Sequence, residues 1–233
     1  MMDQKILENY VNRIINTSMK LDTRQQILLL ITLAYRYSYF FSEAIAAGKV
    51  EHGEEFLTEC FIKPCTLVVG YLKSNRKIAR KIAKELKGKE DVLALFMNRY
   101  EDTMAIMPML SVICLFMAIV LIHGQPLLRG DWQMVILFPT SDWNFCLENQ
   151  TDKETRELIN LCAGNEIAVL RDTVDFVKKK CPAQNHNSLP LTDEFISELL
   201  DYASSDIEKV FNSKPGEFWE PKGAEILELS GED

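Results

Sequence analysis

The sequence predicts an all-α protein: one bundle of about eight helices around a central apolar helix at residues 109–123, with little or no β structure. Three observations support this prediction. The run from Met104 to Ile122 carries no charge, and apolar residues elsewhere recur at helical spacing. The chain of 233 residues also contains only 10 Gly and 8 Pro, so long loops should be scarce.

The central run can be a buried helix or a membrane span. Pro108 suits the first turn of a helix, and His123-Gly124 followed by Pro126 suits its end. A helix of about fifteen residues between them fits a protein core better than a bilayer. The alternative is a single span at 104–122, favoured by the many Lys and Arg residues on its N-terminal side.

The N-terminal third predicts three helices. Residues 3–20 repeat apolar side chains on one face, and Asp22-Thr23 offers an N-cap for a second helix from about Arg24 to Ala47. Residues 51–72 predict a third helix with a kink near Pro64.

The segment 73–89 differs in composition from the rest of the chain. It contains eight basic residues and one acid, Glu85, whereas the remainder carries 18 basic and 33 acidic residues. Ser74-Asn75 can cap a helix here and Gly88 can end it, with an apolar stripe from Ile78 to Leu86. The alternative to a binding face is a solvated helix surface. The candidate polyanion- or partner-binding residues are Lys73, Arg76, Lys77, Arg80, Lys81, Lys84 and Lys87.

The C-terminal half continues the helical pattern with two uncertain points. Residues 132–138 suit a short strand or a buried helical turn, and Gly164 is a candidate break in a helix that runs to Lys180. The loop 181–190 is the best domain boundary. We therefore expect a helical core domain at 1–190, with an amphipathic helix that starts near Thr192 and an acidic tail at 191–233 packed on the same domain.

Motifs for catalysis, cofactors and metals are not recognisable in the chain. It lacks phosphate-binding glycine loops and the nucleophile elbow, and its three histidines are scattered. Cys181 with His186 lacks an orienting partner, and the acids around His52 are better explained as a solvated face. We therefore predict no catalytic, cofactor or metal site and lean against an enzyme.

The function that this sequence favours is a non-catalytic interaction or scaffold protein that binds a protein partner. The alternatives are polyanion binding (nucleic acid or anionic lipid) through 73–89, or a single-pass membrane protein. The net charge of −8 argues against a protein that coats nucleic acid over its whole surface. The polar opening of the chain and six cysteines without a C-x-x-C pair are typical of a cytoplasmic protein with reduced thiols.

Overall fold

The all-α prediction is confirmed by the computed structural model. It describes residues 4–38, 57–74, 76–100, 106–137, 153–181 and 191–207, and these residues are 88% helical and contain no strand. The chain forms two compact units, each built from separate segments: 1–20, 128–180 and 205–233 in the first, and 21–127 and 181–204 in the second. The division into 1–190 and 191–233 stays a prediction.

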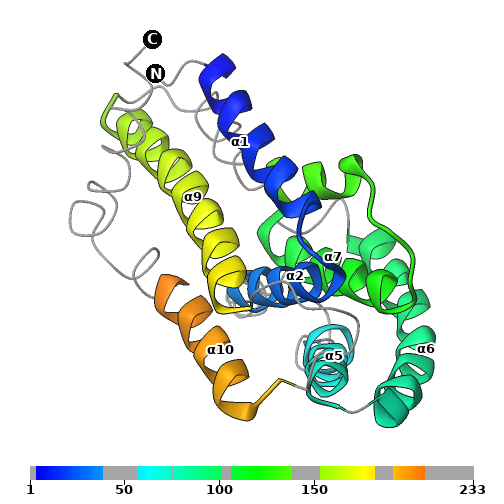
Figure 1. Cartoon of the computed structure of the whole chain (residues 1–233). Coiled ribbons are helices and arrows are strands. Elements are labelled where there is room, and N and C mark those ends of the chain that lie inside the picture. Colours follow the sequence, from blue (N-terminus) through cyan, green and yellow to red (C-terminus); the bar gives the residue numbers. More distant parts are fainter. Residues whose placement is uncertain are drawn as a thin grey trace. The chain divides into compact units, whose positions relative to one another are not determined.

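The first unit contains α1 (Gln4–Met19), a helical stretch at 129–137 and α9 (Lys153–Lys180), shown in Figure 1. α1 packs on α9. The predicted apolar face of α1 is buried at Val11, Ile14 and Ile15. α9 continues through Gly164 without a break, because one glycine costs a helix only about 1 kcal/mol and the buried turn at 167–170 that follows it offsets that loss.

The stretch 129–137 settles the ambiguity between strand and helix in favour of helix. Trp132, Val135 and Ile136 are buried, which is the helical spacing i, i+3, i+4. At the start of the stretch, the backbone N–H of Leu128 donates to Asp131 Oδ2 at 2.6 Å. Phe138 lies outside the described residues.

The second unit is centred on α2 (Thr23–Tyr37) and α7 (Ile106–Ile122), which pack extensively on each other. Asp22 caps α2 as predicted, and Gln25 completes a capping box. The continuous run from Ile27 to Ala34 is buried on every side of the helix. The predicted continuation of this helix to Ala47 lies mainly outside the described residues.

The predicted central helix is α7, with its bounds moved to Ile106–Ile122. Pro108 lies in its first turn, where no intrahelical N–H is required. Gly124 adopts a φ of +79°, and the N–H groups of Gly124 and Gln125 donate to the carbonyls of Leu121 and Val120. This is a Schellman motif, so the predicted glycine stop is confirmed. Among the described residues, no helix combines the length and apolar character that a bilayer span requires.

The described part of the second unit also contains η1 (Thr58–Ile62), α5 (Lys63–Lys73), α6 (Arg76–Tyr100) and α10 (Asp193–Ile207). The π-helical turn η1 leads directly into α5, next to the predicted kink at Pro64. α6 packs on α5 and α7, and α10 buries Ile196, Leu199 and Ala203. The first turn of α10 is capped by Thr192, whose Oγ1 accepts the N–H of Phe195 at 3.2 Å.

Candidate polyanion- or partner-binding surface

The basic segment belongs to a helical hairpin rather than to one helix from 73 to 89. Lys73 is the last residue of α5, and α6 begins at Arg76 and passes through Gly88 to Tyr100. The prediction that Gly88 ends the helix is therefore wrong. The apolar pattern continues across this glycine, and Leu86 and Leu93, one heptad apart, are both fully buried on the same face.

The hairpin is held together at close range. The Ser74 hydroxyl donates to the Gly70 carbonyl at 2.6 Å and ends α5. A Cβ atom added to Gly70 would stand 3.5 Å from Ile82 Cδ1, so the two helices are already in contact there. In the middle of α6's basic part, His123, just after α7, donates from Nε2 to the Ala83 carbonyl at 2.9 Å. These contacts turn one side of α6 toward the core and leave the opposite side outward.

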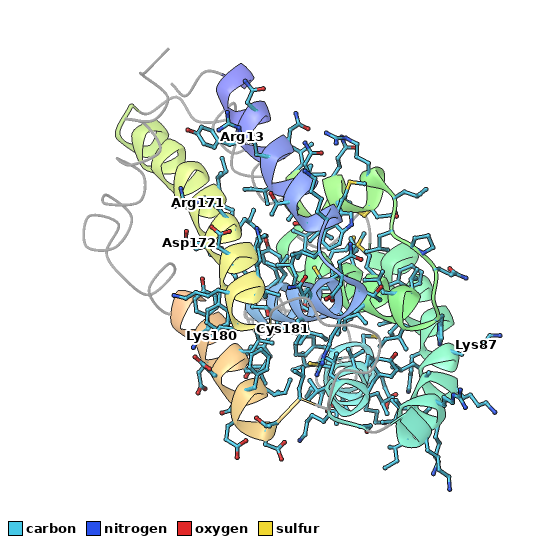
Figure 2. The ribbon with its side chains drawn as sticks, in the orientation of Figure 1. Arg13, Lys87, Arg171, Asp172, Lys180 and Cys181 are labelled. Atoms are coloured by element: carbon cyan, nitrogen blue, oxygen red, sulfur yellow. The ribbon has the colours of Figure 1, made fainter. Side chains whose placement is uncertain are left out.

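The outward side of α6 gathers most of the predicted basic residues, and we call it the basic face. At 100° per residue, Lys77, Arg80, Lys81 and Lys84 lie within one third of the helix circumference, opposite Leu86. Lys87 lies at the edge of this band, and Figure 2 shows its side chain extending away from the ribbon. From Lys77 to Lys87 the helix rises about 15 Å. The exposed residues of the basic face are Lys77, Arg80, Lys81, Lys84 and Lys87.

One predicted site residue, Lys73, lies outside this group, and a second, Arg76, cannot be assigned to it or away from it. Lys73 ends α5 and forms an ion pair with Asp193 at the start of α10. Arg76 is the first residue of α6, and its side chain lies outside the described residues. The backbone N–H of Leu191 donates to the Leu72 carbonyl at 3.1 Å, which fixes the approach of α10 to this corner. An acidic helix thus already meets the basic hairpin within the second unit.

The apolar stripe of the segment is only partly buried. Leu86 is enclosed, Ile82 and Ala83 are half-buried, and Ile78 is 49% exposed. Ile78 lies about 80° around the helix from Leu86, so it falls at the margin of the packed side. It adds an apolar group beside the basic face, next to the exposed Glu85.

Lys89 lies away from the basic face because it contacts Glu59 on η1. Its Nζ stands 3.4 Å from Glu59 Oε2, and Glu59 also pairs with Lys63. The hydrogen bond from Lys63 is the main reason that the pKa of Glu59 is lowered, with Lys89 adding to the effect. Lys89, like Lys73, is therefore paired within the fold.

The described residues contain little that could support metal or thiol chemistry. In that part of the chain, no group of three or more His, Cys, Asp or Glu side chains could hold a metal ion. Burial raises the pKa of the Cys60 thiol to about 11 and that of Cys65 to about 12, so neither is a ready nucleophile. Cys181 is buried and its thiol pKa is raised, while His186, Glu51, His52 and Glu55 lie outside the described residues.

Sequence reasoning missed how the acids of α10 are arranged. They follow the spacing i, i+1, i+5, i+8 and form one exposed face that begins at Asp193, the partner of Lys73. The helical period alone could have revealed this face, whereas its contact with α5 depends on tertiary structure. The face contains Asp193, Glu194, Glu198 and Asp201.

The chain matches no family model, no curated protein and no solved structure in the comparisons made.

Proposed function

We propose that this chain is a non-catalytic helical interaction protein that binds an acidic protein partner through the basic face of α6. The observation that carries the proposal is the exposure of Lys77, Arg80, Lys81, Lys84 and Lys87 along one side of a helix whose other side is packed in the core. Because the helix that carries these cations is already folded, binding an extended anionic surface costs no backbone ordering here.

The composition of the basic face favours a protein over a nucleic acid. The face has no aromatic side chain on which bases could stack. The net charge of −8 also opposes broad attraction to nucleic acid.

Two neighbouring features fit a partner helix with acidic and apolar side chains. Ile78 offers an exposed apolar contact at the edge of the basic face. Within the chain itself, Asp193 at the start of α10 pairs with Lys73 of this hairpin, in the way proposed for a carboxylate of the partner helix. The proposal assigns no catalytic residue, and it places the protein in the cytoplasm, where free thiols such as the buried Cys60 and Cys65 stay reduced.

The test compares three anionic probes on the full chain: an acidic amphipathic helical peptide, a short DNA duplex and vesicles that contain anionic lipid. The double variant Arg80→Glu/Lys84→Glu reverses two charges of the basic face without altering Ile82 or Leu86. The matched control, Lys178→Glu/Lys179→Glu, reverses two exposed charges near the end of α9.

We expect the peptide to bind in a salt-sensitive manner and the α6 variant to weaken binding roughly tenfold or more, while the α9 variant binds like the wild type. Equal loss in both variants, or no peptide binding at low salt, would contradict the proposal. If duplex DNA or anionic vesicles bind more strongly than the peptide, and the α6 variant loses that binding, the ligand of the basic face is a polyanion and not an acidic protein.

A further inference from the structure

The first unit contains a partly open cavity between α1 and α9, on helices other than the one that carries the basic face. Its volume is about 160 Å³. The two helices pack side by side (Figure 1), and each contributes residues at helical spacing from one face. The lining residues are Tyr10, Arg13, Ile14 and Thr17 from α1, and Ile167, Ala168, Arg171, Val174 and Asp175 from α9.

The cavity has an apolar floor and a polar rim. Ile14, Ile167, Ala168 and Val174 are all buried, so they form its inner wall. The Thr17 hydroxyl donates to the Arg13 carbonyl at 2.9 Å and is thus satisfied within α1. A cavity of about 150 Å³ lined by apolar side chains can hold a benzene molecule. The space therefore matches one aromatic ring or a short branched chain.

The rim carries two guanidinium groups with different surroundings. Arg171 contacts Asp172 on the same helix, with Nη2 3.1 Å from Oδ1. The guanidinium carbon of Arg13 stands 5.8 Å from the centroid of the Tyr10 ring. Among the residues that the structure describes, Arg13 forms no ion pair. Figure 2 labels Arg13 on α1 and Arg171 and Asp172 on α9.

We infer that this cavity binds a small monocarboxylate with an apolar body, an aromatic or branched-chain acid of about benzene size. The apolar body occupies the floor against Ile14, Ile167 and Val174, and the carboxylate pairs with Arg13 at the rim. A single negative charge suits the site because Asp172 and Asp175 stand near Arg171 and repel a dianion. Charge-assisted pairing between guanidinium and carboxylate then fixes the orientation of the ligand.

Benzoate is the first probe, titrated into the full chain and followed by the melting midpoint and by calorimetry. A ligand that binds only the folded state raises the melting midpoint as its concentration passes Kd. For a ligand of this size we expect a Kd on the order of 0.1–1 mM. Benzyl alcohol has the ring without the charge, and acetate has the charge without the ring, so both should bind at least about tenfold more weakly.

Two variants locate the site. Arg13→Gln should weaken benzoate binding about 10- to 100-fold and leave benzyl alcohol unaffected, because only the charge-assisted contact is lost. Lys20→Gln removes an exposed charge just beyond α1 and should bind benzoate like the wild type. Ala168→Leu fills the floor of the cavity and should abolish the benzoate-induced shift of the melting midpoint. If this variant does not fold, the comparison of benzoate binding between Arg13→Gln and Lys20→Gln tests the site by itself.

The inference fails if benzoate and 3-methylbutanoate both leave the melting midpoint and the calorimetric heats unchanged. It also fails if Arg13→Gln and Lys20→Gln bind benzoate equally well, because the acid would then bind elsewhere. Neither result would bear on the basic face, whose acidic peptide is tested with α6 variants.

Discussion

Ser111 on α7 donates a hydrogen bond of 2.7 Å to the backbone carbonyl of Ala34 on α2. Ser111 is the polar residue of the uncharged run, and its hydroxyl is buried at the contact between the two helices. The same carbonyl also accepts the N–H of Ser38 at 3.0 Å. The contact thus joins α2 and α7 through a residue small enough to let their backbones approach.

Two substitutions separate the hydrogen bond from the close packing. Ser111→Ala should lower the free energy of unfolding by only about 0.5–1.5 kcal/mol, because Ala34 keeps its bond from Ser38. Ser111→Leu should cost more, at about 1–3 kcal/mol, because the larger side chain must separate α7 from α2. Urea unfolding measures both values. Equal costs for the two variants would show that the helices are not in close contact at this position.

The packing of α7 gives a second prediction. Leu115 is fully buried, so Leu115→Ala should reduce the free energy of unfolding by about 2–5 kcal/mol through lost burial and the cavity left behind. The matched control is Leu128→Ala, because Leu128 is 70% exposed and should change stability by less than about 0.5 kcal/mol. A melting midpoint that stays the same in Leu115→Ala would show that α7 has no packed core around it.

The buried thiol of Cys65 predicts a dependence of stability on alkaline pH. Burial raises its pKa from 9.0 to about 12 in the folded state, so the folded protein keeps a proton that the unfolded chain releases above pH 9. A group with a raised folded pKa stabilises fully below its unfolded pKa, and this contribution falls as pH rises from 9 toward 12.

The measurement compares wild type with Cys65→Ala in urea unfolding at about pH 8 and about pH 10. Between these two pH values the wild type should lose about 1 kcal/mol more stability than the variant does. Cys60 and Cys114 are present in both proteins, so their contributions cancel in the difference. The same pH dependence in both proteins would mean that the Cys65 thiol ionises as it does in the unfolded chain.

The pair between Lys73 and Asp193 gives a prediction about partner binding. The Asp193 side chain is 75% exposed, so Asp193→Asn should change the free energy of unfolding by less than about 1 kcal/mol. Removing this negative charge beside the hairpin should nevertheless strengthen the binding of an acidic peptide by about two- to fivefold at low salt.

Fluorescence anisotropy with a labelled acidic peptide measures this gain, and Asp201→Asn serves as the control two turns farther along α10. Weaker binding by Asp193→Asn than by the control would contradict a role for the acidic helix in limiting access to the basic face.

The features that the sequence determined by itself are local ones. Asp22 and Thr192 cap their helices and Gly124 ends α7, because a cap depends on the few residues around the helix terminus. The outward cations of α6 were predictable for a similar reason, since their spacing follows from the helical period once the opposite stripe is apolar.

The tertiary structure decided the outcome where two local sequence patterns predicted different structures. Gly88 and Gly164 both remain inside helices, because buried residues in an adjoining turn, Leu86 before Gly88 and Ile167 after Gly164, offset the intrinsic cost of glycine. Ile78 and Ile82 look equivalent in the sequence, yet Ile82 contacts α5 near Gly70 and Ile78 remains exposed. The pairing of Lys73 with Asp193 and the cavity of Arg13 and Arg171 join segments more than 100 residues apart, and such contacts arise only when helices pack.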